Sequence, residues 1–518
     1  MHADGCPCYR TLLFPLFGKI LAHAHVVCKY RYTRGSESYS GMAEPASSRA
    51  LAALLLLLLF LPPFPPNVAV SQSIIKNLPG FPGDLPFKLE TGCSYVGIGE
   101  VEDVQLFYYF IESESDPKVD PLFLWLTGGP GCSAFSGLVY EIGPLTFNYD
   151  NFSGKLPTFE LNPFSWTKVA SIIFVDAPVG TGFSYSKTTQ GYNTGDSLSV
   201  KQTYEFLRKW LINHSNFLWN PLYITGDSYS GLLVPIIVQE IHNGNELGLL
   251  PHMNLKGYVL GNPVTDEYNH LNARVPYAHR MALISDELYK AVKSDCNGHY
   301  ANADPNNAPC IANLEAVTRC TDSVYLCQIL EPSCSSWLSP RPSFFQWDKN
   351  VKENIRDFMD LPSQRPKQRC REYNYLFSYT WANDKTVQNA LHVREGTVRE
   401  WVRCNWTLSY TYDVENSVGY HRNISREAYR GLVYSGDHDM SVPHIATEDW
   451  IRLLNLSITD NWRPWFVDGQ SGGFTEEYNH NNFHLTYATI KGGGHTAPEY
   501  KPKECHAMIS RWLAFYPL

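Results

Sequence analysis

Ser228, in the segment GDSYSG at 226–231, constrains the fold more than any other feature of this chain. It follows a short apolar run with β-forming residues at 221–224 and precedes an apolar stretch at 232–238 that predicts a helix. A serine at such a strand–turn–helix junction sits on a strained turn, with its hydroxyl exposed near the helix N-terminus. The context therefore predicts a nucleophile. The fit to G-x-S-x-G is imperfect because Ser230 stands where glycine is usual, and a plain glycine turn is the alternative.

A nucleophilic serine needs a general base, and the base needs an acid that orients it. The run at 431–436 predicts a buried strand that leads to Asp437, and Asp439 follows two residues later. The run at 485–490 predicts another strand, which leads through a three-glycine loop to His495. Serine, acid and histidine in this order are typical of α/β-hydrolases. Order alone does not separate Asp437 from Asp439.

A loop rich in glycine precedes the serine and suits the binding of a negatively charged oxygen. The apolar run at 123–126 predicts a strand that ends in the loop TGGPGCS at 127–133. Backbone N–H groups of such a loop, together with that of Tyr229, can stabilise a tetrahedral intermediate. A simple glycine turn is again the alternative.

In these segments the chain resembles the serine carboxypeptidase family, and within it the plant serine carboxypeptidase-like proteins. The resemblance extends from about residue 74 to the C-terminus and implies an α/β-hydrolase fold, with a mostly parallel central sheet flanked by helices. The shared segments are WLTGGPGCS at 125–133, DAPVGTGFSY at 176–185, GDSYSG at 226–231, GNP at 261–263, SGDHD at 435–439 and GGGH at 492–495.

The resemblance assigns a role to each residue of the expected site. Ser228 is the nucleophile, His495 the general base, and Asp437, rather than Asp439, the orienting acid. The backbone N–H groups of Gly129 and Tyr229 form the oxyanion hole. Neither a cofactor nor a metal is implied.

Two departures from the peptidases of this family concern substrate binding. The peptidases have Asn where this chain has Thr127 and Glu where it has Asp227, and both residues help to bind the C-terminal carboxylate of a peptide. Gly128, beside Thr127, belongs to the same expected substrate site. The sequence GDSYSG at 226–231 resembles that of the acyltransferase branch of the family, whose members take an acyl group from a glucose ester.

We therefore expect an acyltransferase that moves an acyl group from a 1-O-glucose ester to an alcohol through an acyl-serine. The expected partners are a small-molecule acyl donor and acceptor. An acid serine carboxypeptidase is the alternative. A non-catalytic secreted glycoprotein is a more distant one, because Ser228, Asp437 and His495 are all present.

The N-terminal region predicts export. Residues 51–61 are almost entirely Leu and Ala, and they are followed by prolines and a plausible cleavage site near Ser71. This run is shorter than the about 20 residues that a membrane span needs. We expect an upstream extension at 1–41, a signal peptide at 42–71, and a mature protein in the vacuole or outside the cell, with no membrane partner.

Cysteines and glycosylation sequons agree with an oxidising compartment. The resemblance implies disulfides Cys132–Cys334, Cys296–Cys310 and Cys320–Cys327, and leaves the pairing of four cysteines open: Cys93, Cys370, Cys404 and Cys505. The N-x-S/T sequons begin at Asn151, Asn213, Asn405, Asn423 and Asn455.

The composition fits one large domain at 72–518. Its 44% hydrophobic residues can supply a sizeable core, and the net charge of −9 argues against a nucleic-acid partner. A segment at about 266–400, richer in cysteine, proline and polar residues, predicts a cap inserted over the site. Within it, residues 335–369 form a linker that some family members excise, which gives either a monomer or a processed two-chain heterodimer. A solvated loop is the alternative.

Overall fold

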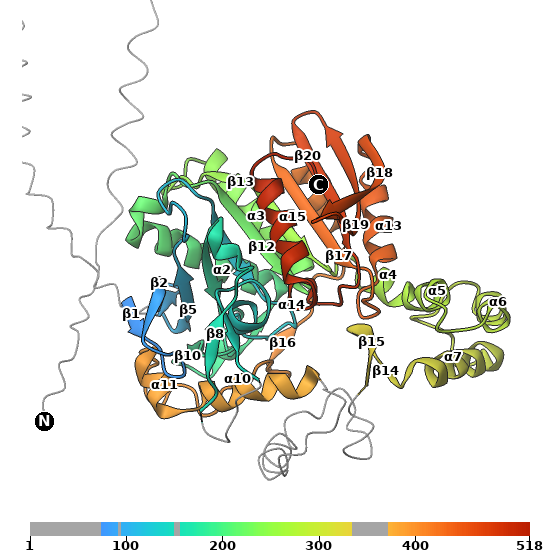
Figure 1. The fold of residues 1–518 in the computed structure, drawn as a ribbon, viewed down its shortest axis with the longest axis horizontal. Coiled ribbons are helices and arrows are strands. Elements are labelled where there is room, and N and C mark those ends of the chain that lie inside the picture. Colours follow the sequence, from blue (N-terminus) through green and yellow to red (C-terminus); the bar gives the residue numbers. More distant parts are fainter. Residues whose placement is uncertain (1–73, 92–94, 150–155, 334–370) are drawn as a thin grey trace, which may run out of the picture. The chain divides into compact units, whose positions relative to one another are not determined.

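The central sheet organises the computed structural model, which describes residues 74–91, 95–149, 156–333 and 371–518 (Figure 1). The expected extension at 1–41, the signal peptide at 42–71 and the linker at 335–369 lie outside the described residues. The sheet has eleven strands. In spatial order they are β1 (Ile74–Asn77), β2 (Asp84–Thr91), β5 (Tyr108–Ile111), β9 (Ser171–Val175), β6 (Leu122–Leu126), β12 (Leu222–Asp227), β13 (Leu255–Gly261), β17 (Arg430–Gly436), β20 (Phe483–Ile490), β19 (Gln470–His480) and β18 (Ser457–Val467).

The middle of this sheet is parallel and its two margins are antiparallel. The strands from β9 to β20 pair in parallel, whereas β1, β2 and β5 on one side and β18 and β19 on the other pair antiparallel. Parallel strands need crossover connections, which place helices on the faces of the sheet.

Strand β6 shows why both faces of the sheet must be covered. All five of its side chains are buried, and they alternate between two hydrophobic clusters. Phe123 and Trp125 belong to the cluster that includes Trp512. Leu122, Leu124 and Leu126 belong to the cluster that includes Trp210. A near-continuous apolar run is therefore what this central strand requires.

Helices cover both faces of the sheet. Helices α2 (Asp196–Asn213) and α3 (Ser230–Glu246) contribute to the cluster around Trp210, and so does α13 (His444–Leu453). Helix α15 (Pro502–Leu513) contributes Trp512 to the other cluster, as α10 (Tyr375–Ala382) contributes Trp381. The layers are helix, sheet and helix (Figure 1).

Between β13 and β17 the chain leaves the sheet and forms an insertion (Figure 1). Part of it has a hydrophobic cluster of its own, which reaches Met440 and Ile445 of the main body. The inserted elements are α4 (Glu267–Asn272), α5 (Arg274–Arg280), α6 (Asp286–Asp295), α7 (Ala308–Thr321), β14 (Val324–Tyr325), β15 (Gln328–Pro332), α10, α11 (Lys385–Ala390), β16 (Tyr410–Thr411) and α12 (Val418–Ile424).

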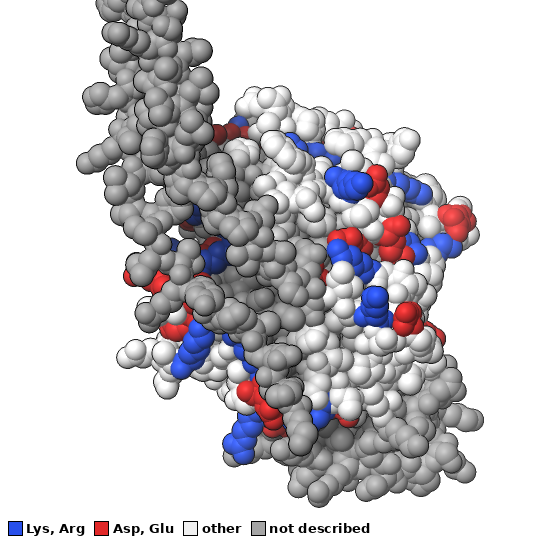
Figure 2. All heavy atoms as spheres, turned by 90° about the vertical axis from the view of Figure 1, so that its left-hand side faces the viewer, with Lys and Arg blue, Asp and Glu red and all other residues white. Residues whose placement is uncertain are grey.

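This architecture is an α/β-hydrolase fold, as the sequence predicted. No helix in the described ranges is both long and apolar enough to span a bilayer. On the face drawn in Figure 2, acidic and basic side chains are interspersed over the described surface.

The structure corrects the expected pairing of Cys132. This cysteine is bonded to Cys404, so the prediction of Cys132–Cys334 is wrong. Two backbone hydrogen bonds hold the cysteines opposite each other, from Ser133 N to Arg403 O at 2.7 Å and from Asn405 N to Gly131 O at 2.8 Å. Spacing in the sequence gives no sign of this isolated antiparallel bridge.

The other two expected pairs have different outcomes. Cys296–Cys310 is present, as predicted. Cys320 and Cys327 both carry free thiols, so that pairing is wrong. Cys320 is exposed on α7, whereas burial raises the pKa of the Cys327 thiol to about 12, with the charge of Asp439 adding to the effect.

Among the sequons, Asn213, Asn423 and Asn455 are exposed, as a glycosylation site must be. Asn405 differs, because its Nδ2 donates to Gly180 O at 3.0 Å. Asn151 lies outside the described residues. Glycosylation stays a prediction.

The corrected disulfide generates a test. Non-reducing peptide mapping should link the peptides of Cys132 and Cys404. Replacing both cysteines by Ala should lower the free energy of unfolding by about 2–4 kcal/mol, because the bridge closes a loop of 272 residues in the unfolded chain. The matched control, Cys296→Ala with Cys310→Ala, opens a loop of only 14 residues and should cost less. A peptide that joins Cys132 to Cys334 would contradict the structure.

Candidate active site

Ser228 lies on a sharp turn between β12 and α3. Its φ is 63°, a left-handed conformation that is unusual for a residue with a side chain. Two hydrogen bonds to the end of β13 and to the segment after it fix the turn, from Ser228 N to Gly261 O at 3.0 Å and from Val264 N to Ser228 O at 2.9 Å. Strain that is held in this way by the surrounding backbone is typical of a functional residue.

Each position around Ser228 holds a small residue for a different structural reason. A Cβ on Gly226 would lie 2.4 Å from both Leu126 O and Ser230 Oγ, and one on Gly231 would lie 2.5 Å from the Cβ of Pro263. Ser230 itself is accommodated because its hydroxyl donates to Asp227 O at 2.6 Å. The departure from G-x-S-x-G is therefore compatible with the turn, and Gly231 provides the close approach.

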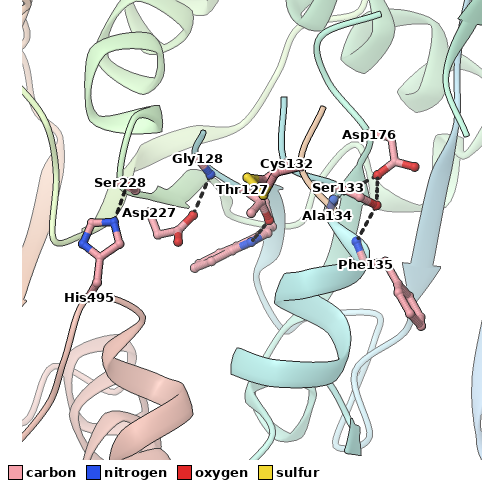
Figure 3. The surroundings of a disulfide bond; sticks show 12 residues. Thr127, Gly128, Cys132, Ser133, Ala134, Phe135, Asp176, Asp227, Ser228 and His495 are labelled. Carbon is pink, nitrogen blue, oxygen red and sulfur yellow. Dashed lines mark hydrogen bonds between the residues drawn. A yellow bond between two sulfur atoms is a disulfide. The ribbon is translucent and has the colours of Figure 1, made fainter. Parts of the chain in front are cut away.

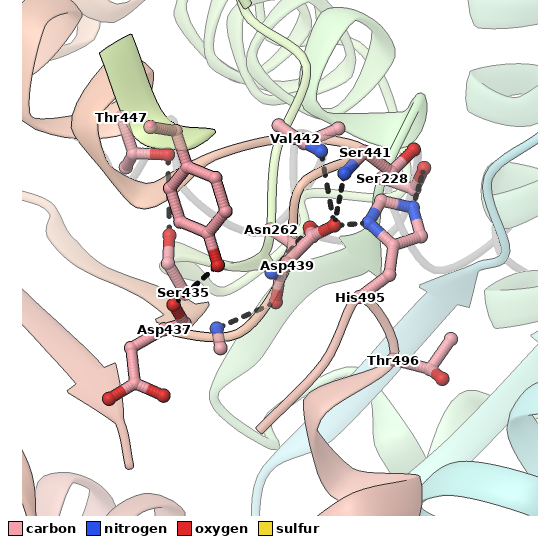
Figure 4. A network of polar contacts seen from close by, with 12 residues as sticks. Ser228, Asn262, Ser435, Asp437, Asp439, Ser441, Val442, Thr447, His495 and Thr496 are labelled. Carbon is pink, nitrogen blue, oxygen red and sulfur yellow. Dashed lines mark hydrogen bonds and ion pairs between the residues drawn. The ribbon is translucent and has the colours of Figure 1, made fainter. Parts of the chain in front are cut away.

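His495 brings the general base to the serine. Its Nε2 lies 2.7 Å from Ser228 Oγ and its Nδ1 lies 2.7 Å from Asp439 Oδ2. It follows β20, while Asp439 follows β17, and these two strands are neighbours in the sheet. The predicted nucleophile and base are thus together, within hydrogen-bond distance (Figures 3 and 4).

Asp439 is held as a carboxylate by donors on both oxygens. Besides His495, Oδ2 accepts from Asn262 Nδ2 at 2.8 Å, and Oδ1 accepts from the backbone N–H groups of Ser441 at 2.7 Å and Val442 at 3.2 Å. The side chain is fully buried. A buried charge needs such a complete set of partners, and this set also fixes the direction in which Asp439 faces His495.

The assignment of Asp437 as the orienting acid is wrong. Its Oδ1 binds His438 Nδ1 at 2.6 Å and Gly492 N at 2.6 Å, and its carboxylate points away from His495 (Figure 4). Asp437 therefore binds Gly492, at the start of the loop that carries His495 (the histidine loop). Asp439 orients the base. Two acids that lie two positions apart on one turn cannot be separated by their order in the sequence.

The surroundings of His495 set its charge. Burial favours the neutral imidazole, but the charge and hydrogen bond of Asp439 outweigh it, so the pKa of His495 is raised from 6.5. This is the behaviour of a base that must accept and hold the serine proton during the reaction.

The glycine loop packs directly against the serine turn (Figure 3). A Cβ on Gly128 would lie 2.5 Å from the Cβ of Ser228 and 2.8 Å from Tyr229 N. Gly128 N itself donates to Asp227 Oδ1 at 2.9 Å. The amide of Gly129, whose φ is 123°, is the next in the loop. Together with Tyr229 N, it is the pair that we assign to the oxyanion hole.

Asp176 anchors the same loop to the end of β9. Its Oδ1 accepts from Ser133 Oγ at 2.7 Å and Ala134 N at 2.9 Å, and its Oδ2 accepts from Phe183 N at 2.9 Å. Burial raises the pKa of Asp176 to about 6, although these donors oppose the shift. The segment DAPVGTGFSY at 176–185 thus supports the oxyanion loop.

The side chains at the two positions that differ from the peptidases, Thr127 and Asp227, already accept hydrogen bonds within the protein. Thr127 Oγ1 accepts from Trp125 Nε1 at 3.1 Å, and Asp227 accepts from Gly128 N as described above. Burial raises the pKa of Asp227, and the nearby His495 opposes the shift. Thr127 begins the oxyanion loop, and Asp227, at the end of β12 beside Ser228, binds that loop through Gly128 N (Figure 3).

Glu141 is a second buried acid near Asp227 that the sequence analysis missed. It is 3% exposed, and its Oε2 is buried without a hydrogen-bond partner in the protein. Burial raises its pKa well above the usual range, and the charge of Asp227 raises it further. A neutral carboxyl of this kind can donate a hydrogen bond to a ligand. Its signal in the sequence is an acid within the apolar run at 134–142.

An aromatic group next to the nucleophile was also missed. The ring of Tyr229 lies 6.3 Å from that of Tyr410 and 6.1 Å from that of Tyr412. The hydroxyls of Tyr229 and Tyr410 both donate to Asp196 Oδ1, at 2.8 and 2.7 Å. Tyr412 is 56% exposed. It therefore offers an accessible aromatic surface beside the serine turn.

A strained serine, a histidine base, an orienting acid and an amide-lined loop are the groups that serine hydrolases use to form a covalent acyl-enzyme. The described residues contain no cluster suited to a metal ion.

Comparison with known proteins gives the family. The model of the serine carboxypeptidase family, Peptidase S10, matches residues 79–514, and the chain belongs to this family. Serine carboxypeptidase-like 1 of Arabidopsis thaliana is 50% identical over 448 residues, which cover 86% of this chain and 94% of the relative. Serine carboxypeptidase-like 2 of the same plant is 48% identical over 477 residues, which cover 92% and 100%.

A solved structure gives the same fold. The crystal structure of Kex1(Δ)P, a prohormone-processing carboxypeptidase from Saccharomyces cerevisiae, aligns with a TM-score of 0.62 at 18% identity, over 83% of this chain and 91% of that one. At this identity the likeness establishes the fold.

The corrected triad is tested by a matched pair of substitutions, Asp439→Asn and Asp437→Asn. Asp439→Asn should slow acylation of Ser228 by about a thousandfold or more, because the amide no longer holds the base in the required tautomer. It should also move the acid limb of the rate profile to lower pH, because His495 loses the charge that raises its pKa. Stopped-flow acylation with an activated ester measures both effects.

Asp437→Asn is the control for this prediction. Its acylation rate should stay within about tenfold of the unaltered enzyme, because Asp437 binds His438 and Gly492 and does not contact the ring of His495. A larger loss in Asp437→Asn than in Asp439→Asn would restore the original assignment and contradict the structure.

Proposed function

We propose that this serine carboxypeptidase-like enzyme is an acyltransferase, which moves an acyl group from a 1-O-glucose ester to an alcohol. The observation that carries the proposal is the state of the two positions that bind the C-terminal carboxylate in the peptidases. Thr127 offers one short hydroxyl that already accepts from Trp125, and Asp227 is shorter than Glu and already accepts from Gly128 N. This pair is poorly suited to a peptide carboxylate.

The reaction uses the geometry of the triad twice. Ser228 Oγ attacks the ester carbonyl while His495 Nε2 takes its proton, and the oxyanion is stabilised by the N–H groups of Gly129 and Tyr229. His495 then gives the proton to the departing glucose oxygen, which leaves acyl-Ser228. The acceptor hydroxyl loses its proton to His495, attacks the acyl carbon, and releases the new ester as Ser228 is reprotonated.

Transfer must compete with water, which is present at tens of molar. A well-oriented acceptor can win because fixed orientation is equivalent to effective concentrations of about 10⁵ M or more. The exposed ring of Tyr412, beside Tyr229, offers apolar surface for the organic part of a donor or acceptor. The enzyme then acts on small molecules as a monomer or processed two-chain form. We place it in the vacuole or outside the cell.

Acid carboxypeptidase activity is the second candidate, and Glu141 is the observation that favours it. This acid is buried near Asp227, and its raised pKa keeps it protonated in acid, so that it can donate to a peptide carboxylate. The same hydrogen bond could instead reach a sugar hydroxyl. Glu141 alone therefore does not decide between the two donors.

The deciding experiment offers the purified enzyme an aromatic 1-O-glucose ester and a blocked dipeptide, each with and without an alcohol acceptor. We expect glucose release from the ester, with most of the acyl group recovered on the alcohol. The catalytically inactive Ser228→Ala is the control for spontaneous transfer. Release of the C-terminal amino acid at a rate equal to or above that of glucose release would contradict the proposal.

A double substitution, Thr127→Asn with Asp227→Glu, tests whether these positions choose the donor. The restored pair should bind a peptide carboxylate, and a hydrogen bond to a charged group contributes about 1.5–3 kcal/mol, or roughly ten- to a hundredfold in affinity. Peptidase activity should therefore rise, mainly in acid, where the new Glu can be protonated. Transfer from the glucose ester should fall.

The two single variants are the controls, because either change alone leaves the pair incomplete. A double variant that handles both donors as the unaltered enzyme does would place the choice of donor elsewhere in the site.

A further inference from the structure

The hairpin formed by β14 and β15 contacts both catalytic loops at its tip. The backbone N–H groups of Met440 and Ser441 donate to Leu326 O at 2.9 and 3.0 Å. The next carbonyl of the tip, that of Cys327, accepts from His495 N at 2.7 Å. Two consecutive peptide groups of the insertion therefore bind the loop of the catalytic acid and the loop of the catalytic base.

These contacts reach the groups that orient the triad. Ser441 N, which donates to Leu326 O, also donates to Asp439 Oδ1 at 2.7 Å. The approach to the histidine loop is so close that a Cβ on Gly494 would lie 2.3 Å from Cys327 O. A displacement of the tip must therefore move both loops.

The start of β15, just after the tip, adds two more hydrogen bonds to the same loops. Ile329 N donates to His438 O at 3.0 Å, next to the catalytic acid. The buried side chain of Gln328 donates through Nε2 to Gly492 O at 3.1 Å, in the glycine run before His495. Each catalytic loop is thus held at two points.

Arg371 holds this hairpin in place. Its guanidinium binds both carboxylate oxygens of Glu331, on β15, with Nε–Oε1 and Nε–Oε2 distances of 3.1 and 3.2 Å and an Nη2–Oε1 distance of 2.9 Å. Its Nη1 binds Glu499 Oε1 at 3.3 Å, and the guanidinium lies 4.1 Å from the centre of the Tyr500 ring. Arginine suits such a site because its planar group can bind one carboxylate in fork geometry and stack on an aromatic ring.

Glu499 connects Arg371 to the histidine loop. It lies in the short helix α14 (Ala497–Tyr500), which begins two residues after His495. Its Oε2 accepts from Thr496 Oγ1 at 2.7 Å and from Tyr375 OH at 3.0 Å. The side chain of Glu499 is only 7% exposed and that of Arg371 is 24% exposed, so water screens this ion pair weakly.

We propose that Arg371 is a positioning residue for the triad. It ties the β14–β15 hairpin, through Glu331, to the helix that follows His495, through Glu499. The hairpin tip in turn holds the loops of Asp439 and His495 at the separation that catalysis needs. The insertion is then part of the catalytic support.

The test uses Arg371→Gln in the full-length enzyme, with acylation of Ser228 by an activated ester as the readout. Acylation is shared by transfer and hydrolysis, so this inference can fail without the proposed function failing. We expect the acylation rate constant to fall about tenfold or more with little change in ester binding, because a shift of about 1 Å at a reacting group costs about a hundredfold.

A second readout is the acid limb of the acylation rate. The titratable and charged groups that act on His495 are Asp439, Asp227, Arg274 and His270. All four groups remain in the variant. If Arg371 contributes only to overall stability, the acid limb should therefore stay at the same pH. A looser contact between Asp439 and His495 should move the limb to lower pH, because this contact raises the pKa of His495.

Matched variants complete the experiment. Arg371→Lys keeps the positive charge but loses the fork geometry of the guanidinium. Its acylation rate constant should lie between those of Arg371→Gln and the unaltered enzyme. Glu331→Gln should give a similar loss, and its combination with Arg371→Gln should be less than additive. Arg452→Gln removes an arginine that also pairs with two acids, Glu448 and Asp449 on α13, and should acylate normally.

The inference is overturned if folded Arg371→Gln acylates Ser228 at the unaltered rate and with the same acid limb. It is equally overturned if Arg452→Gln loses as much activity. Should Arg371→Gln fail to be secreted, Glu331→Gln carries the same expectations, and unaltered acylation in that variant overturns the inference.

Discussion

Parallel pairing of four neighbouring strands is the constraint on which the catalytic site depends. Strands β12, β13, β17 and β20 lie side by side, and their carboxyl ends are in register: Asp227 is opposite Gly261, Gly261 opposite Tyr434, and Gly436 opposite Ile490. Residues that follow these ends must therefore meet, although Ser228 is more than 200 positions from both Asp439 and His495 in the chain. The hydrogen bonds from Ser228 N and Val264 N then convert this register into one fixed serine conformation.

The sequence predicted those parts of the site that follow directly from strands. The apolar runs at 221–224, 431–436 and 485–490 became β12, β17 and β20, and Ser228 and His495 lie where these runs end. Asp439 could not be distinguished from Asp437 because both lie on one turn. The choice depends on Asn262 and on the amides of Ser441 and Val442, which turn Asp439 toward the histidine.

Contacts between distant segments were the least predictable. The pairing of Cys132 with Cys404 rests on two backbone hydrogen bonds between segments about 270 residues apart, and neither cysteine carries a local sign of it. Glu141 is similar, since only the folded chain shows that it is buried near Asp227. Arg371 is another case, because its partners Glu331 and Glu499 come from opposite sides of it in the sequence.

The central claim is that Ser228 carries the acyl group between donor and acceptor. Mass spectrometry of the intact enzyme, quenched in acid soon after mixing with a donor ester, measures this directly. The account predicts a mass increase of one acyl group, located at Ser228 by peptide mapping, that disappears when an alcohol acceptor is added and is absent in Ser228→Ala. Transfer at an undiminished rate by Ser228→Ala, with no acyl adduct on the unaltered enzyme, would contradict it.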